Sequence, residues 1–500
     1  MSELEQQLNV DDKVANYIFV SKDIPQSLVN EELEDAGAYN QRMVQIKKYY
    51  GIYRNGAKFD IEGTNGDYQG ANLKFKKAAR LINKEARFLF GKTPDLLVNP
   101  RGDIVNVTGS VKQMVNAYQE YIKTVCSKNN LGKQLVLAAK DCFIGGLVGA
   151  YLNFNEQTGV RLTFLNATQF VFETKADNSD ELSKFVAFTI VNDSMQQNKK
   201  RIFKKKYELK QVNGKNVCYV SEALYDGTGT MIEELMAETK TEFERIPAVV
   251  ICNDGLLDDL YGESEIAQLV DSESWYNKLS SSDIDASRKN MNAIRYAVDM
   301  DSNSTANLST APGAFWDLQT DQNLDKANPQ VGTLETQMSY SGPLQSTLER
   351  IDNEMYDMLD IPNINIESMK GTITSGKALK ALYWSLVVRC EEKLKTWGPK
   401  LRYLVSCMID GALAYPNCVK NYTDETLTPI NYEIEVDPNY PLPEDENEEK
   451  QMDMVEVQGG TMSHKAYMKK WRELTDAEAD EELTQIASEK VGDMHNFDVM

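Results

Sequence analysis

A glycine-rich stretch in the second half of the chain comes closest to a catalytic motif. Residues 371–378 read GTITSGKA, which fits the phosphate-binding pattern GxxxxGK[ST] at every position except the last. The hydroxyl at that position binds Mg²⁺ in P-loop enzymes, and Ala378 has no hydroxyl. Residues 363–370 are short and polar, unlike the buried strand that precedes a P-loop. A P-loop-like ATPase that uses Lys377 is therefore kept only as an alternative.

A structural interpretation fits the same residues better. Gly371 and Gly376 give a loop conformational freedom, because glycine has no Cβ. Thr374 or Ser375 can cap a following helix, since a side-chain hydroxyl accepts a hydrogen bond from a free N–H of the first turn. The spacing favours a loop that leads into a helix.

Other residues that could do chemistry form weaker patterns. Residues 299–303 begin like a calcium loop, but the sixth position is not glycine and the twelfth is Thr310 instead of Glu. The 7 cysteines are scattered without a CxxC pair, which is typical of buried thiols in a reducing compartment. Only 2 histidines occur, His464 and His495, and neither has a ligand or nucleophile beside it in the sequence. We expect no catalytic residue, no metal and no cofactor.

The composition is that of an ordinary globular protein. The chain has 500 residues, 42% of them hydrophobic and 26% charged, which allows several domains with a sizeable core. No run of about 18 apolar residues occurs, so we expect no transmembrane helix. The N-terminus is acidic and polar and lacks the basic and apolar regions of a signal peptide.

The net charge of −22 argues against a protein that grips DNA, because such proteins need a basic footprint. The charge is compatible with a DNA conduit, because an acidic lining repels the polyanion and does not hold it. DNA in transit is therefore a possible partner, and a specific DNA sequence is not.

The first half of the chain predicts helices followed by short strands. Apolar spacing and stop signals predict helices at 39–50, 72–94, 111–129 and 133–145. Alternating apolar and polar residues, separated by turns such as Asn213-Gly214, predict strands at 150–154, 161–165, 185–190, 205–209 and 247–251. The basic residues of 72–94 could contact DNA, but an apolar stripe through Ala78, Leu81 and Phe88 favours a helix with a solvated basic face.

The second half predicts a polar helix, an insert, a second helix, a loop and a long helix. These elements are expected at 264–290, 291–338, 343–361, 363–372 and 375–415. Ser264 is the expected cap of the first helix, and Gly398-Pro399 predicts a kink in the last. A strand at 431–436, an acidic linker and helices around 451–458 and from Thr475 to Lys490 complete the chain. The expected fold class is α+β.

Several of these segments resemble the phage portal family of the SPP type. IPAVVICN at 246–253 followed by GESEI at 262–266 is similar to the strand that leads into the family's first stem helix. TSGKAL at 374–379 is similar to the start of its long helix. GGTMS at 459–463 and the segment 481–489 resemble its closing helices. The likeness covers most of the chain from about residue 40, and the order of the motifs carries it.

The resemblance implies a portal-type fold that assembles as a ring, usually of twelve subunits, at one capsid vertex. The implied parts are an N-terminal arm at 1–40, a wing at 41–260 with 416–445, a stem at 261–290 and 339–361, a clip at 291–338, a tunnel loop at 362–374, a long wing helix at 375–415 and a crown at 446–500. The ring would be the channel for DNA packaging and ejection and a head–tail connector.

The resemblance also implies roles for particular residues. The tunnel loop would present to double-stranded DNA the residues Asn363, Asn365, Glu367, Lys370, Gly371 and Thr372. The stem would contribute Arg288 and Lys289, which could contact the DNA backbone or form ion pairs between subunits. The clip would dock partners through Arg295, Asn303, Phe315 and Trp316. Lys370 would be the only cation of its loop, so twelve copies would place a sparse ring of positive charge in an acidic tunnel.

The implied partners are further copies of the chain, the terminase large subunit, a head-completion adaptor, and the major capsid and scaffolding proteins, with no membrane. The implied location is the virion, after assembly in the bacterial host cytoplasm. Besides the ATPase, the sequence leaves open another capsid-associated adaptor protein.

Overall fold

The computed structural model describes residues 24–33, 36–60, 70–101, 109–192, 200–256, 259–291, 294–301, 319–320, 328, 330–334, 339–364, 380–423, 425–442, 446–472 and 479–486. The chain divides into two compact units. The first comprises Met1–Ile361 and Val388–Tyr440, and the second comprises Pro362–Val387 and Pro441–Met500. Helices and strands both occur throughout the first unit, which confirms the α+β fold class.

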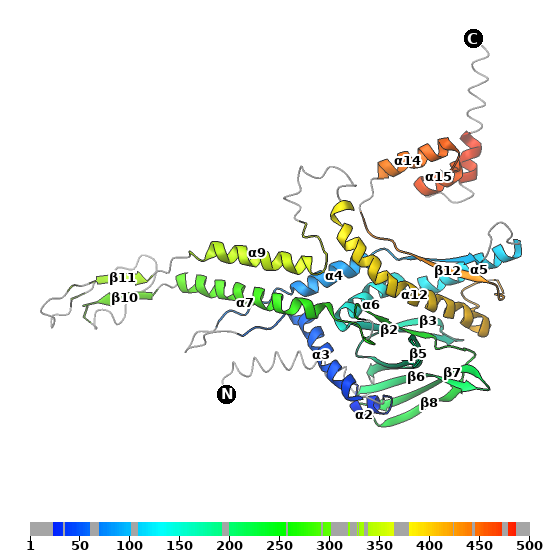
Figure 1. Ribbon diagram of the computed structural model, residues 1–500, viewed down its shortest axis with the longest axis horizontal. Helices are drawn as coiled ribbons and strands as arrows, with labels where there is room; N and C mark the ends of the chain where they lie inside the picture. Colours follow the sequence, from blue (N-terminus) through cyan, green and yellow to red (C-terminus); the bar gives the residue numbers. More distant parts are fainter. Residues whose placement is uncertain are drawn as a thin grey trace, which may run out of the picture. The chain divides into compact units, whose positions relative to one another are not determined.

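The helices of the first unit mostly follow the predicted apolar spacing (Figure 1). They are α2 (Gln26–Asn30), α3 (Ala36–Asn55), α4 (Lys77–Phe90), α5 (Gly109–Lys128), α6 (Leu131–Gly145), α7 (Glu265–Met291), α9 (Ser341–Asp357), α12 (Trp384–Ala414) and α13 (Pro416–Val419). The apolar stripe of α4 is buried as expected, with Ala78, Leu81 and Phe88 all less than a tenth exposed. No described helix is long and apolar enough to cross a bilayer.

The strands of the first unit form four antiparallel groups. The five-stranded sheet is an unbroken meander of β4 (Phe170–Lys175), β5 (Asn178–Asn192), β6 (Lys200–Val212), β7 (Lys215–Asp226) and β8 (Met231–Lys240). The predicted Asn213-Gly214 turn joins β6 to β7, and both residues have positive φ, as a two-residue type I′ hairpin requires.

The smaller sheets join segments that are distant in the sequence. A three-stranded sheet has the order β3 (Gly159–Asn166), β2 (Leu147–Asn155) and β9 (Ala248–Cys252). Two pairs complete the unit: β1 (Asp95–Pro100) with β12 (Tyr432–Asp437), and β10 (Ile294–Val298) with β11 (Gln330–Leu334). The strand expected at 431–436 is thereby confirmed, whereas its partner β1 was not foreseen because it follows directly after a predicted helix.

Three helix boundaries differ from the prediction. The helix expected from residue 72 begins at Lys77, because residues 70–75 run extended along α7 and Lys76 adopts a left-handed conformation. The helix expected to end at 361 ends at Asp357, and Asp360 adopts a left-handed conformation. In the run expected from 375, a turn at residue 383 precedes α12, which then continues through Pro399.

The second unit contains α14 (Glu446–Gly459) and α15 (His464–Arg472). The predicted turn at 459–463 lies between them, with Gly460 at a positive φ of 75°. Helix α15 was missed by the sequence analysis, although the Ser463 hydroxyl accepts a hydrogen bond from the Ala466 N–H at 3.1 Å and so caps it. The expected helix cap Thr475 lies outside the described residues.

All seven cysteines have free thiols. Five of them are buried and two are partly exposed. Burial raises the pKa of each thiol. The thiols are therefore protonated at neutral pH and act as small apolar side chains, as the scattered pattern predicted.

Candidate functional site

Helices α7 and α9 lie side by side in the first unit, and the pair β10–β11 connects their outer ends (Figure 1). Helix α7 begins at its predicted cap: the Ser264 hydroxyl accepts a hydrogen bond from the Ile266 N–H at 3.2 Å and donates to the Ile144 carbonyl at 2.6 Å. The cap therefore also fastens the start of α7 to α6.

One face of α7 carries a row of polar side chains, which we call the polar ladder. Its members are four residues apart: Glu273, Asn277, Ser281 and Asp285. The three C-terminal members, Asn277, Ser281 and Asp285, accept hydrogen bonds from alternate N–H groups of the extended segment 70–75. Asp285 accepts from Ala71 at 2.9 Å, Ser281 from Leu73 at 2.9 Å, and Asn277 from Phe75 at 3.0 Å.

The ladder side chains and the alternate N–H groups of the extended segment are spaced by nearly the same distance. Four residues of a helix rise about 6 Å, and two residues of an extended chain rise about 6.6 Å. Each ladder side chain, four residues from the last along α7, therefore meets the next N–H that points toward α7 in the extended segment, two residues further along. The ladder satisfies the N–H groups of Ala71, Leu73 and Phe75, which a helix begun at residue 72 would leave without an intrahelical partner.

Glu273, at the end of the ladder nearest the N-terminus of α7, is buried and accepts hydrogen bonds from the backbone at the ends of two other helices. Its Oε1 accepts from the Ala57 N–H at 3.1 Å, just after α3, and its Oε2 accepts from the Ala78 N–H at 2.9 Å. Ala78 is in the first turn of α4, whose own cap position, Lys76, provides no side-chain hydrogen bond. Glu273 therefore takes the place of a local cap. The spacing of four was visible in the sequence, but its partner was not.

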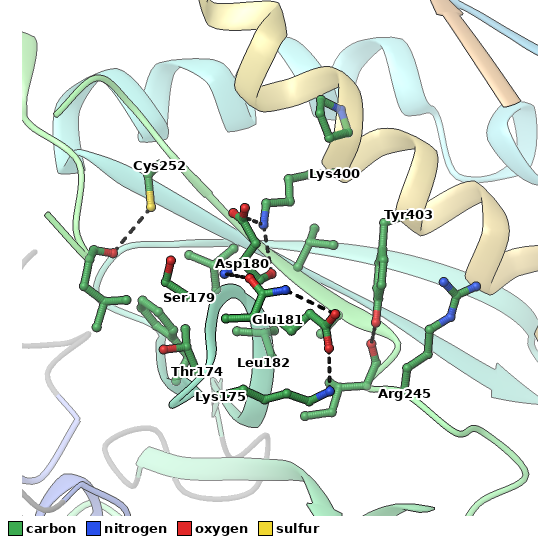
Figure 2. A pocket seen from close by; sticks show the side chains of 18 of the residues that line it. Thr174, Lys175, Ser179, Asp180, Glu181, Leu182, Arg245, Cys252, Lys400 and Tyr403 are labelled. Carbon is green, nitrogen blue, oxygen red and sulfur yellow. Dashed lines mark hydrogen bonds and ion pairs between the residues drawn. The ribbon is translucent and has the colours of Figure 1, made fainter. Parts of the chain in front are cut away.

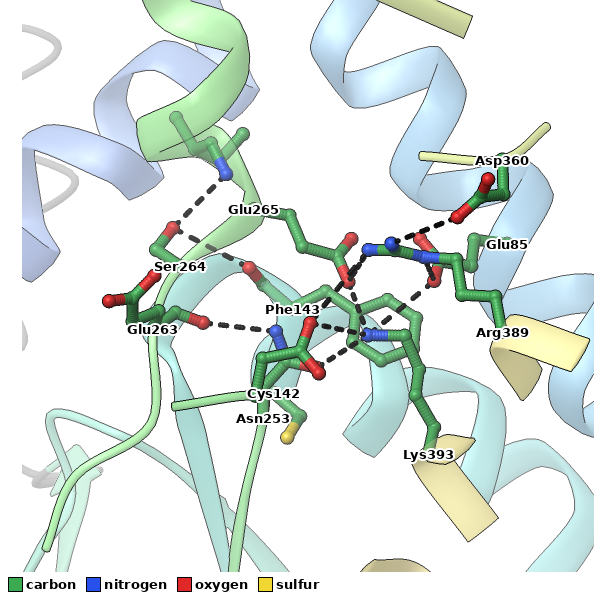
Figure 3. Close-up of polar contacts among 12 residues, drawn as sticks. Glu85, Cys142, Phe143, Asn253, Glu263, Ser264, Glu265, Asp360, Arg389 and Lys393 are labelled. Carbon is green, nitrogen blue, oxygen red and sulfur yellow. Dashed lines mark hydrogen bonds and ion pairs between the residues drawn. The ribbon is translucent and has the colours of Figure 1, made fainter. Parts of the chain in front are cut away.

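A second polar group lies at the N-terminal end of α7, and we call it the charged cluster (Figure 3). It consists of Glu85 from α4, Glu265 from α7, and Arg389 and Lys393 from α12. Lys393 Nζ lies 2.6 Å from Glu265 Oε1 and 3.5 Å from Glu85 Oε1. Arg389 Nε lies 2.7 Å from Glu85 Oε1, and its Nη2 lies 3.2 Å from Glu265 Oε1. The cluster joins three helices that are far apart in the sequence.

Neighbouring groups complete the surroundings of the charged cluster. Lys393 Nζ also donates to Asn253 Oδ1 at 2.8 Å and lies 4.5 Å from the centre of the Phe143 ring. Asp254 and Asp360 are about half exposed at the margin, 3.6 Å from Lys393 and 3.7 Å from Arg389 respectively. Glu85, Glu265 and Lys393 are themselves almost wholly buried.

The protonation of the cluster is uneven. Burial raises the pKa of Glu85 to about 8, and the neighbouring Glu265 adds to this shift. Burial also acts to raise the pKa of Glu265, but Lys393, a hydrogen bond with Glu85, and Arg389 outweigh it, so that this pKa is lowered. Burial acts to lower the pKa of Lys393 and of Arg389, but the carboxylates outweigh it and both pKa values are raised.

A cavity of about 650 Å³ lies between the β4–β5 hairpin, β9 and α12 (Figure 2). Apolar side chains such as Phe172, Leu182 and Val250 line part of it. Several charged residues at its rim form ion pairs: Lys175 with Glu181, Lys400 with Asp180 at 3.2 Å, and Arg245 with Asp410 outside the lining. The Lys400–Asp180 pair holds the hairpin against α12, Lys175–Glu181 lies within the hairpin, and Arg245–Asp410 joins the segment before β9 to α12. These pairs give this part of the rim a structural explanation.

The residues expected to contact DNA or partners fall only partly within the described chain. Asn363 follows α9 and belongs to the second unit, whereas Asn365, Glu367, Lys370, Gly371 and Thr372 lie outside the described residues. The same is true of Asn303, Phe315 and Trp316, and of the P-loop-like residues 371–377. Arg295 is in β10, opposite Thr333 of β11, and Lys289 is in α7.

Arg288 is in the last turns of α7, and its side chain is 52% exposed. Its Nη1 lies 3.8 Å from Asp285 Oδ1, the ladder residue that also accepts from Ala71. An ion pair of this length at a half-exposed site contributes little to stability. Among the expected site residues that the structure describes, Arg288 is the one that lies at the ladder.

Comparison with known proteins identifies a family and several similar solved structures. The family described as "Phage portal protein, SPP1 Gp6-like" matches residues 35–494. No curated protein matches the chain. Two similar solved structures are the neck of a native GTA particle computed with C12 symmetry and the neck of an empty GTA particle computed with C6 symmetry. Each is 10% identical to this chain, with a TM-score of 0.41, and the match covers 78% of this chain. It covers 88% of the chain in the native particle and 87% of the chain in the empty one.

The family match spans nearly the whole chain, including the helix pair, all four sheets and the closing helices. It also covers the polar ladder and the charged cluster. The chain belongs to the SPP1 Gp6-like family of phage portal proteins.

Proposed function

We propose that the protein is the portal subunit of a tailed phage and assembles into a ring of twelve copies at one capsid vertex. Double-stranded DNA would pass through the ring during packaging and ejection. The observation that carries this proposal is the family match over residues 35–494, since a portal or connector function belongs to the family. The net charge of −22 supports a conduit over a DNA-gripping protein.

The parts of the portal are assigned to the described elements by their order in the chain. Helices α7 and α9 take the stem at 261–290 and 339–361, and β10 with β11 lies in the clip at 291–338. The wing at 41–260 with 416–445 contains both larger sheets and β12, and the long wing helix at 375–415 contains α12. The arm at 1–40 includes α2, the tunnel loop is at 362–374, and the crown at 446–500 contains α14 and α15.

The partners follow from this assignment. The clip would dock the terminase large subunit during packaging and a head-completion adaptor afterwards, and the wing and crown would contact capsid and scaffolding proteins. The portal would form in the host cytoplasm and remain in the virion. The family is a structural one, and we propose that this chain performs no catalysis. The family match gives no support to the alternative of a P-loop-like ATPase at 371–377.

Ring formation is the first test. The full-length protein should give rings with a central hole in negative-stain electron microscopy, at about twelve times the chain mass of 56.5 kDa in solution. Because some rings form only on a template, the same measurement is made after co-expression with the phage scaffolding protein. A monomer under both conditions would contradict the portal proposal and would favour a monomeric adaptor protein.

The tunnel loop provides a functional prediction. Lys370→Glu should reduce the amount of DNA packaged per head without preventing ring assembly, because it reverses the one cation of the loop in every subunit. Packaged DNA is measured by nuclease protection, and rings are counted by microscopy. Lys380→Glu, which makes the same charge change beyond the proposed loop, is the control. Normal packaging by Lys370→Glu would remove the proposed role of this residue.

A further inference from the structure

The charged cluster contains more acidic groups than basic ones. Four carboxyl groups, those of Glu85, Glu265, Asp254 and Asp360, lie within 4 Å of only two cations, Arg389 and Lys393. The two inner carboxyl groups are buried, with side-chain exposures of 0% for Glu85 and 1% for Glu265. A second buried negative charge at this point is costly, because burial removes the water that would stabilise it.

Two oxygen atoms of the cluster have no donor. Oε1 of Glu85 and Oε1 of Glu265 both face the cations, but Oε2 of each is buried with no N–H or O–H donor among the described residues. Buried oxygens without a donor are rare in folded proteins, so each requires an explanation. The side chains of Glu85 and Glu265 lie within hydrogen-bond reach of each other, and two ionised carboxylates have no hydrogen to share. One proton on this pair supplies the missing donor without any further group.

We propose that Glu85 and Glu265 share one proton, which resides on Glu85, and that this proton holds the base of α7 to α4 and α12. The pair then carries one negative charge and not two. The proton site is a property of the junction within one chain, so it does not depend on the ring or on DNA.

The position of the proton follows from the surroundings of the two groups. Glu265 lies 2.6 Å from Lys393 and is the first residue of α7, where the positive end of the helix dipole also favours a negative charge. Glu85 lies in the interior of α4, 3.5 Å from Lys393, and its strong contact is with Arg389 alone. Glu265 is therefore the better place for the charge, and Glu85 for the proton. The raised pKa of Glu85 and the lowered pKa of Glu265 agree with this order.

The titratable and charged groups around Glu85 and Glu265 come from every element packed against them. They are Arg389, Cys390 and Lys393 of α12, Cys142 of α6, Asp254 after β9, and Asp360 after α9. The pKa values of Cys142 and Cys390 are raised by burial, so both thiols are neutral near pH 7. The pKa values of Arg389 and Lys393 are raised, so both stay charged. Of the buried groups, Glu85 is the one expected to change its charge near pH 8.

The proton gives the junction a defined pH dependence. The pKa of Glu85 is raised in the folded chain from 4.5 to about 8, so the folded state binds this proton more tightly than the unfolded state. The resulting stabilisation is complete below about pH 4.5 and is lost as the pH rises through about 8. Alkaline conditions should therefore loosen the attachment of α7 at its first turn.

Isosteric variants of the full-length protein test the site. Glu85→Gln imitates the protonated acid and should unfold near the wild-type temperature at about pH 6, with a smaller fall in melting temperature on going to about pH 9. Glu265→Gln removes the charge that Lys393 requires and should melt below the wild type at both pH values. Glu392→Gln, an exposed change on the same helix, should keep the wild-type melting temperature and pH dependence.

The outcomes separate the possibilities. If the melting temperatures of Glu85→Gln and Glu392→Gln fall equally between about pH 6 and 9, the proposal is overturned. If only Glu265→Gln shows a smaller fall than the wild type, the proton resides on Glu265 and the proposed assignment to Glu85 is wrong. If Glu85→Gln does not fold, hydrogen exchange of the wild type decides. Protection in 77–90 and 263–270 should then fall between about pH 7 and 9, relative to the β6–β7 hairpin after correction for intrinsic exchange. Unchanged relative protection would also overturn the proposal.

Discussion

The charged cluster and the polar ladder are fixed to the same helix, α7, but they hold it by different physical means. The cluster brings full charges of opposite sign together in a buried place, and Lys393 Nζ lies 2.6 Å from Glu265 Oε1. The ladder pairs side-chain oxygens with backbone N–H groups, at 2.9–3.1 Å from Glu273 to Asp285. Both occur on a helix whose fully buried apolar side chains, Ile266 and Leu269, lie in its first turns.

The difference has consequences for energy and for register. A buried ion cluster contributes little net stability, yet removing one member leaves a charge without its partner and is costly. Each rung of the ladder contributes about 1 kcal/mol, and losing one leaves the others in place. The cluster therefore decides whether the base of α7 is attached, and the ladder decides which N–H of segment 70–76 meets which turn of α7.

The largest effect is expected when the cluster loses a cation. Lys393→Met should lower the free energy of unfolding by about 3–5 kcal/mol, because Glu265 then keeps a buried charge with only Arg389 to neutralise it. Urea unfolding followed by circular dichroism measures this loss. Lys395→Met, an exposed change two residues further along α12, is the matched control and should change stability little. Similar stabilities for the two variants would show that the cluster is not the attachment point.

A much smaller effect is expected for one rung of the ladder. Ser281→Ala removes the acceptor of the Leu73 N–H and should cost about 1 kcal/mol. Its neighbour Ser282 is exposed, so Ser282→Ala provides a control with the same chemical change. The same urea experiment distinguishes them.

The pH dependence sharpens the comparison further. Ser281→Ala should keep the wild-type fall in stability between about pH 6 and 9, because the titrating group lies in the cluster and not in the ladder. A changed pH dependence in Ser281→Ala would mean that the two regions are coupled along α7.

Much of the fold could be predicted because local patterns determine it. The strands of the five-stranded sheet follow alternation and the Asn213-Gly214 turn, and α7 begins at the predicted cap Ser264. The family, too, could be suggested from short motifs in the right order, and the match over 35–494 confirmed it. The roles of the tunnel loop, stem and clip residues remain predictions.

The errors arise where a distant partner decides. Residues 72–76 carry a helix-like pattern, but the N–H groups of Leu73 and Phe75 bond to α7, about two hundred residues away in the sequence, and the segment does not join the helix. Glu85 and Glu265 appear in the sequence as ordinary charged helix residues, because burial and a shared neighbour cannot be read from local spacing.

The sequence by itself determined the α+β class, the order of helix pair, insert and long helix, the free cysteines and the acidic charge. These depend on periodicity, turn residues and composition, which act over a few residues. Only the tertiary structure decided that polar residues at every fourth position of α7 accept hydrogen bonds from a distant extended segment. It also decided that four carboxyl groups meet two cations at the base of this helix. Those facts depend on which surfaces meet when the chain packs, and on the loss of water there, and neither is encoded in any one segment.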